Sequence, residues 1–177
     1  MKSFLTIAGL FWLSCLLSAC PYSSPYTLDD APSVYVEDTL LGKWATFMKK
    51  PDSDKEEPVK LIISRKTETE YNIALIGFIK ELKPYRLAVQ DSVKGTAFMS
   101  VIGERQFLNI SIKSQNYIAE LQLKDDKLSL FPLVEHFTSK MIRNNSTLRN
   151  SVEVHYKTRV HPMVDEDFCL KDMIRVN

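Results

Sequence analysis

The stretch that decides the fold is Leu108-Asn109-Ile110-Ser111-Ile112-Lys113-Ser114-Gln115-Asn116-Tyr117-Ile118-Ala119-Glu120-Leu121-Gln122-Leu123. Leu108, Ile110 and Ile112 alternate with polar residues, and an alternation resumes from Tyr117 to Leu123. Successive side chains of a β-strand point to opposite faces, so this period of two is typical of half-buried strands. The polar residues between the two runs predict a short turn. We therefore expect two adjacent strands of an antiparallel sheet.

Similar runs on both sides extend this pair into an antiparallel meander. Ala97–Ile102 precedes it across a turn at Gly103, and Leu128–Leu130 follows it across the polar turn Lys124–Lys127. The charged residues Lys49–Pro58 predict a solvated hairpin connection. β-Branched and apolar runs predict further strands at Trp44–Met48, Val59–Ile63, Tyr71–Ile79, Tyr85–Val89 and Phe137–Ile142.

The segment 147–159 fits two periods at once. Leu148, Val152 and Tyr156 recur in steps of four, as on a helix, but Val152 to Val160 also alternates as a strand does. We favour a helix from Thr147 to Arg159, because Asn145-Ser146 can cap it, it contains no Gly, and Pro162 can stop it. Asp167–Val176 then predicts a closing strand, with Phe168, Leu170 and Met173 facing inward.

Gly42-Lys43-Trp44 at the first strand, the meander, the late helix and the closing strand together resemble a lipocalin-like barrel. The resemblance implies a single mainly β domain over residues 37–177. In this domain the meander closes into a barrel and is followed by one late helix and a C-terminal strand. It also implies that Trp44 lies at the closed end and that a late Arg packs over it, for which Arg175 is the candidate. Trp44, Tyr71 and Tyr117 are therefore our candidates for a pocket or for the core.

The N-terminus carries a second resemblance. Phe4–Leu17 is almost wholly apolar, but 14 residues rise only about 21 Å as a helix, less than the ~30 Å hydrocarbon core of a bilayer. A signal peptide is therefore a better interpretation than a spanning helix. Leu17-Ser18-Ala19-Cys20 is similar to the lipobox of bacterial lipoproteins. The resemblance implies removal of residues 1–19 and acylation of Cys20, with palmitate-type chains.

An extended tether is expected over residues 20–36, because this segment is rich in Pro and Ser and has no apolar period. A lipid on Cys20 would hold the domain on a membrane of the cell envelope without crossing it. We expect the outer membrane, and the sequence does not choose between its leaflets. The whole chain is most similar to small uncharacterised lipoproteins of the Bacteroidota type, which have no assigned chemistry.

Charge argues against a nucleic-acid partner. The chain has 23 basic and 22 acidic side chains, and Lys2 is the only charged residue before Cys20, so the expected mature part is neutral. Binding to phosphate backbones needs a basic field. The partners that we expect are the membrane, through the lipid, and either a small hydrophobic ligand or an envelope protein.

The sequence predicts no catalytic residue, no metal site and no cofactor. There is no Gly-x-Ser-x-Gly, and Glu135-His136 lacks the second His of a zinc-protease helix. His155 and His161 lie near the acidic run Asp165-Glu166-Asp167, but this spacing is not diagnostic of a metal, and a solvated loop is favoured. We therefore expect a non-enzymatic module that binds a small apolar or amphipathic ligand in the barrel. The alternative is a filled barrel that serves as a structural or interaction subunit of an envelope complex. An enzyme is a third, less favoured hypothesis.

Overall fold

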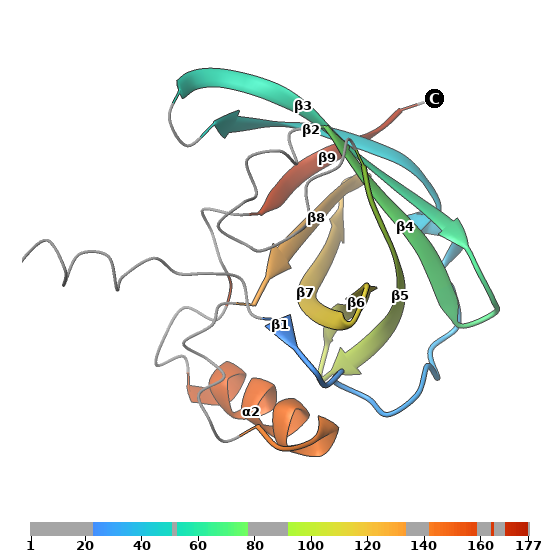
Figure 1. The fold of residues 1–177 in the computed structure, drawn as a ribbon, viewed down its shortest axis with the longest axis vertical. Coiled ribbons are helices and arrows are strands. Elements are labelled where there is room, and N and C mark those ends of the chain that lie inside the picture. Colours follow the sequence, from blue (N-terminus) through green and yellow to red (C-terminus); the bar gives the residue numbers. More distant parts are fainter. Residues whose placement is uncertain are drawn as a thin grey trace, which may run out of the picture.

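A computed structural model describes residues 23–50, 53–77, 92–133, 142–158, 164 and 169–176 (Figure 1). The described elements are β1 (Ser23–Ser24), the 3-10 helix η1 (Asp38–Leu40), β2 (Gly42–Lys50), β3 (Ser53–Arg65), β4 (Glu70–Gly77), β5 (Ser92–Ile102), β6 (Arg105–Ile112), β7 (Gln115–Lys124), β8 (Lys127–Pro132), the helix α2 (Asn145–Thr158) and β9 (Leu170–Val176).

Strands β2 to β9 form a closed antiparallel barrel. Each strand from β2 to β8 pairs with the next along the chain, and β9 pairs with both β8 and β2. Closure satisfies the backbone groups that an open sheet would leave at its edges. The prediction of a mainly β fold is confirmed: the meander closes into an eight-stranded barrel, with one helix in the described part and a C-terminal strand.

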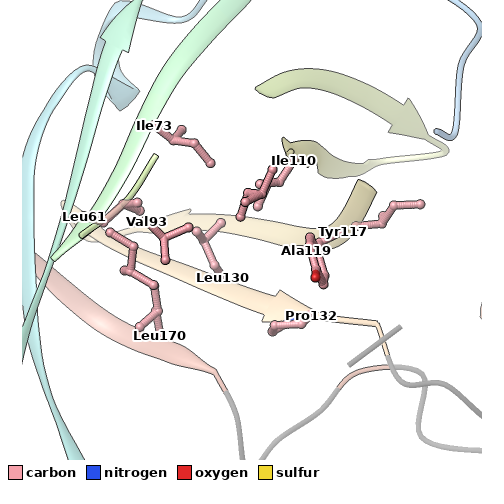
Figure 2. Close-up of a pocket in the computed structure, with 12 residues that line it drawn as sticks. Leu61, Ile73, Val93, Ile110, Tyr117, Ala119, Leu130, Pro132 and Leu170 are labelled. Carbon is pink, nitrogen blue, oxygen red and sulfur yellow. The ribbon is translucent and has the colours of Figure 1, made fainter. Parts of the chain in front are cut away.

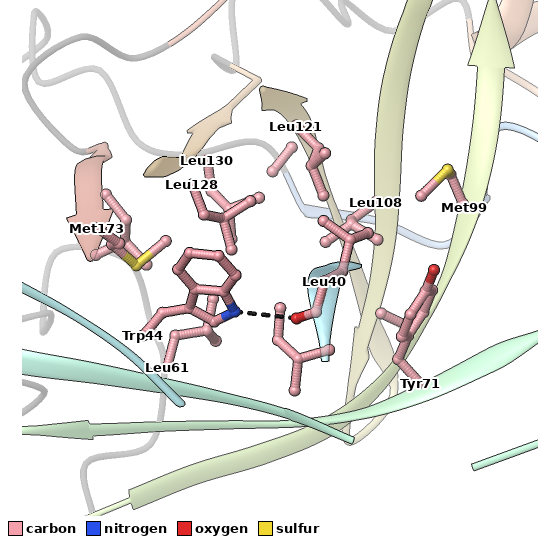
Figure 3. Close-up of a cluster of buried hydrophobic side chains, with 14 of the residues drawn as sticks. Leu40, Trp44, Leu61, Tyr71, Met99, Leu108, Leu121, Leu128, Leu130 and Met173 are labelled. Carbon is pink, nitrogen blue, oxygen red and sulfur yellow. Dashed lines mark hydrogen bonds between the residues drawn. The ribbon is translucent and has the colours of Figure 1, made fainter. Parts of the chain in front are cut away.

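The barrel interior is filled mainly by the side chains that the period-two pattern places inward. Trp44 stands opposite Leu61, and Leu61 opposite Leu75, so inward residues of adjacent strands face one another. Figure 3 shows how these side chains gather around the indole of Trp44. The largest fully buried side chains of this cluster are Leu40, Trp44, Tyr71, Met99, Leu128 and Met173.

The predicted connection over residues 49–58 is wrong, because β3 already begins at Ser53. Lys50 pairs with Ser53, and the strands then run side by side as far as Gly42 opposite Ile63. Polar residues can lie in a strand whose side chains reach water, so pairing with β2 outweighs their weak β propensity. The strand expected at 85–89, the inward Phe168 and all of the strand expected at 137–142 except Ile142 lie outside the described residues.

The helix prediction for residues 147–159 is confirmed as far as Thr158, the last described residue of α2. The cap differs from the expected Asn145-Ser146, because the Asn144 Oδ1 accepts the backbone N–H of Thr147 at 2.7 Å. Leu148 and Val152 are buried against the outside of the barrel and form a second apolar cluster with Phe107 and Ile118. The apolar outer face of β6 and β7 requires such a cover, and a helical stripe supplies it.

Residues 23–36, which belong to the extended tether expected over 20–36, contact the barrel. Ser23 and Ser24 pair with β7, and Leu28 is buried in the second cluster. The backbone N–H of Leu28 donates to the Oδ1 of Asn109 at 2.7 Å, and Asn109 donates in turn to the Oγ of Ser100 at 2.7 Å. Pro and Ser disfavour regular structure, but they do not prevent a chain from covering polar groups on a barrel wall.

A bulge in β9 places Leu170 and Met173 on the same inner face although they are three residues apart. Asp172 has a left-handed φ of 50°, and the pairing with β8 shifts between Leu128 and Leu130. The backbone N–H of Asp172 donates to the Oγ of Ser129 at 3.0 Å. One extra residue on the bulged strand restores the inward direction of Met173.

We expect Asp172→Val to destabilise the barrel by about 1–2 kcal/mol, because a β-branched residue is strained at positive φ. Asp172→Gly should change the free energy of unfolding by less than about 0.5 kcal/mol, since Gly adopts this conformation freely. Urea unfolding of both variants measures the difference. Equal stability of the two variants would contradict the role of the bulge.

Candidate functional site

An apolar cavity of about 110 Å³ lies inside the barrel (Figure 2). Its walls come from β3 to β9, so residues far apart in sequence meet there. The lining side chains are those of Leu61, Ile73, Leu75, Val93, Ile110, Ile112, Tyr117, Ile118, Ala119, Leu130, Pro132 and Leu170. Almost all of them are aliphatic, and none is charged.

Small residues at inward positions leave room for the cavity. Ala119 lies in its wall, and Ala97 follows Val93 on the inner face of β5 with Gly95 between them. A Cβ at Gly95 would stand only 2.4 Å from the backbone oxygen of Ser111, so β5 and β6 approach too closely there for any side chain. The cavity therefore depends on the size of the residues at inward positions. The sequence contains this information, but it can be recognised only when the strand register is known.

The cavity opens toward the end of the barrel where β4 ends and β5 begins. Ile73, Leu75, Ile110 and Ile112 line it but are only half-buried, whereas Ala119 is buried. These aliphatic side chains face inward but still contact solvent. Covering them with an apolar group is favourable by roughly 25 cal/mol per Å² of apolar surface removed from water. The opening therefore favours entry of hydrocarbon.

Among the described residues that line the cavity, Tyr117 alone carries a hydroxyl group. It donates to the Oε1 of Gln115 at 2.9 Å, and burial raises the pKa of its phenol. The group is therefore neutral at physiological pH and retains acceptor capacity on its oxygen. This arrangement suits an uncharged ligand whose apolar part lies in the cavity and whose polar end lies close to Tyr117.

Trp44 lies in the core below the cavity and does not line it. Its side chain is 1% exposed, and its indole N–H donates to the backbone oxygen of Leu40 at 3.0 Å (Figure 3). The guanidinium carbon of Arg175, the residue that the lipocalin resemblance proposes over the Trp, lies 4.8 Å from the ring centroid. Arg175 also donates to the backbone oxygen of Thr39, so η1 is held across this end of the barrel.

Tyr71 is also a core residue. Its hydroxyl oxygen accepts the backbone N–H of Glu37 at 2.9 Å. Burial is the largest cause of a raised pKa for this phenol, and the hydrogen bond from Glu37 opposes it. The structure therefore separates the three candidates: Tyr117 lines the cavity, while Trp44 and Tyr71 belong to the core. Cys20 lies outside the described residues.

A polar cluster outside the barrel joins α2 to β6 and β7. Glu120 is 5% exposed and accepts hydrogen bonds from Tyr156, from Gln122 at 2.9 Å and from Arg105 at 3.2 Å. The guanidinium of Arg105 stacks 3.8 Å from the ring centroid of Tyr156. Both carboxylate oxygens of Glu120 are satisfied, so the cluster serves packing. Sequence reasoning missed it, because the two strands and the helix meet only in the fold.

No family model, curated protein or solved structure matches this chain. Among the described residues, no group of three or more His, Cys, Asp or Glu side chains is placed to hold a metal ion. His161 and Asp165-Glu166-Asp167 lie outside the described residues. In the described part of the chain, no helix has the length and apolar character to cross a bilayer.

The buried tyrosines predict a loss of stability at alkaline pH. The pKa values of Tyr71 and Tyr117 are raised chiefly by burial, and that of Tyr156 by burial and then by Glu120. Unfolded tyrosine ionises near pH ~10, so the stability contributed by the neutral phenols is present below that pH. It is lost as the pH rises through the higher folded values.

Urea unfolding between neutral pH and pH ~11 should therefore show a falling free energy of unfolding above pH ~10. Tyr117→Phe should make this fall shallower. Tyrosinate absorbance that titrates identically in the folded and the urea-unfolded chain would contradict the prediction.

Proposed function

We propose that this protein is a lipid-anchored lipoprotein of the cell envelope whose barrel binds a small apolar or amphipathic ligand without catalysis. The observation that carries the proposal is the open apolar cavity beside Tyr117. Lining of this kind, with one polar group placed among aliphatic side chains, is typical of small-molecule sites.

The cavity volume limits the ligand. An apolar cavity of about 150 Å³ can hold benzene, whereas sites for drug-sized ligands measure about 300–1,000 Å³. A volume of about 110 Å³ therefore suits a very small apolar molecule or the end of a hydrocarbon chain. For an amphipathic ligand, we propose that the chain end enters between Ile73 and Ile110 and that the polar end remains at the opening.

The anchor is supported by Leu17-Ser18-Ala19-Cys20. Two or more acyl chains on Cys20 would give stable attachment, since each buried methylene contributes about 0.8 kcal/mol. We propose that Cys20 carries these chains and that the protein resides in the outer membrane, with the membrane as its partner through the lipid.

The small volume of the cavity also favours a second function. A barrel with this little free space can serve as a structural or interaction subunit of an envelope complex and bind no ligand. Exposed apolar residues on the outer wall, Phe47 and Ile174, are compatible with this alternative.

Native mass spectrometry tests ligand binding in protein purified from its host envelope. We expect a bound non-protein mass that is lost on denaturation. Ala119→Leu should reduce the bound fraction at least about tenfold, because the larger side chain fills the cavity at a cost of about 1–3 kcal/mol in stability. Ala74→Leu, the same change at an outward position, is the matched control and should retain the ligand. A wild-type protein without bound mass, or an Ala119→Leu variant that retains the ligand, would contradict the proposal.

Fractionation of the host tests the anchor. Cys20→Ser should move the protein from the membrane to the soluble fraction and abolish incorporation of labelled palmitate, because the acceptor thiol is removed. Cys15→Ser removes a thiol from the expected signal peptide and should leave both properties unchanged. Labelled lipid on the Cys20→Ser variant would contradict the assignment of Cys20 as the lipidated residue.

A further inference from the structure

We propose that the outer wall formed by β9, β2, β3, β4 and β5 is a docking surface for a protein partner with acidic residues beside an apolar patch. We call it the basic–apolar face and define it by Lys43, Phe47, Lys60, Ile76, Lys94 and Ile174. It lies outside the barrel and shares no residue with the cavity.

The strand registers bring these residues together. Lys60 stands opposite Ala45 on one side and Ile76 on the other, and Ala45 stands opposite Ile174. Ile174, Lys60 and Ile76 therefore lie in one row across four strands. Lys43 and Lys94 lie at the ends of the neighbouring row, about 15 Å apart at ~4.8 Å per strand.

The face has an exposed apolar patch at its β2–β9 edge. Phe47 is 67% exposed, and Ile174 is 55% exposed. Phe47 is two residues from Ala45, the residue opposite Ile174, so the two side chains are diagonal neighbours on the same face, about 7–8 Å apart. An exposed aromatic side chain beside an aliphatic one is the kind of anchor that contributes strongly to protein interfaces.

The charge of the face is mainly positive. In β2 to β5, residues 43–47, 58–62, 72–76 and 92–96 contain three lysines and no Asp or Glu, and β9 carries Lys171, Asp172 and Arg175. Lys43, Lys60 and Lys94 form no ion pair with any residue that the structure describes, while Arg65, Lys66 and Lys157 are each paired with a carboxylate. Unpaired positive charge beside an apolar patch is complementary to an acidic protein surface, which it would steer and orient.

The position of the face argues against the bilayer as its occupant. β1 pairs with β7, and three strands separate β7 from β3 in either direction around the barrel. Figure 1 shows β1 and α2 across the barrel from β2 and β3. If Cys20 is lipidated as proposed above, only three residue steps lead from it to Ser23, and these span at most about 10 Å. The anchor would therefore hold the β1 side near the membrane and turn the basic–apolar face away from it.

Site-specific photocrosslinking in the intact envelope of the native host tests the surface. We expect Phe47→p-benzoylphenylalanine to give a crosslinked product of one discrete mass that protease removes. Val154→p-benzoylphenylalanine, at an exposed position of α2 on the other side of the barrel, is the control and should not give that product.

Charge reversal identifies the acidic character of the partner. Lys60→Glu, combined with the crosslinker at position 47, should reduce the product at least about tenfold, because like charges then face one another. Lys60→Arg should preserve it. The crosslinked partner peptide, read by mass spectrometry, should be rich in Asp and Glu.

Three results would overturn the proposal: no product from position 47, a product that Lys60→Glu leaves unchanged, or a product that resists protease because it is lipid or polysaccharide. A soluble Cys20→Ser variant that still crosslinks would show that the face acts independently of the anchor. If only the proposed lipid anchor is wrong, the Cys20→Ser variant will instead remain bound to the membrane.

Discussion

The insertion of β9 between β2 and β8 is the constraint on which the rest of the structure depends. The strands β2 to β8 form a simple meander, which by itself would leave two open edges. β9 pairs with both edges, and its bulge at Asp172 lets one short strand present Leu170 and Met173 to the interior. Closure then defines an inside and an outside for every strand. It places Trp44 at one end of the interior and the cavity above it.

The strands and the helix could largely be predicted from the sequence, because period-two alternation is a local signal. The β3 extension over 53–58 could not, because its polar residues are held by pairing with β2. The contact between Leu28 and Asn109 likewise could not be predicted from residues 23–36, because the two residues are distant in sequence and meet only in the folded chain. The two periods of 147–159 were decided by something outside the segment, namely the apolar wall at Phe107 and Ile118.

The site was harder to predict than the fold. Aromatic residues drew attention to Trp44 and Tyr71, but the cavity lies beside a residue that lacks bulk, Ala119. The strand register decides which inward residues lie at the same height in the barrel. A shift of one residue would exchange the inner and outer faces of a strand. Tyr117 could be recognised as a candidate, but its position beside an opening could not be derived from its neighbours in the sequence.

The packing of residues 23–36 on the barrel has a consequence for the evolution and engineering of the N-terminal part. This segment cannot be exchanged like a spacer, because Leu28 and its backbone N–H complete the wall over Asn109 and Ser100. A shortened chain that starts at Glu37 would expose those groups together with the apolar cluster beneath α2. The folded unit therefore includes Ser23, and a change in the length of the N-terminal part has to be made upstream of it.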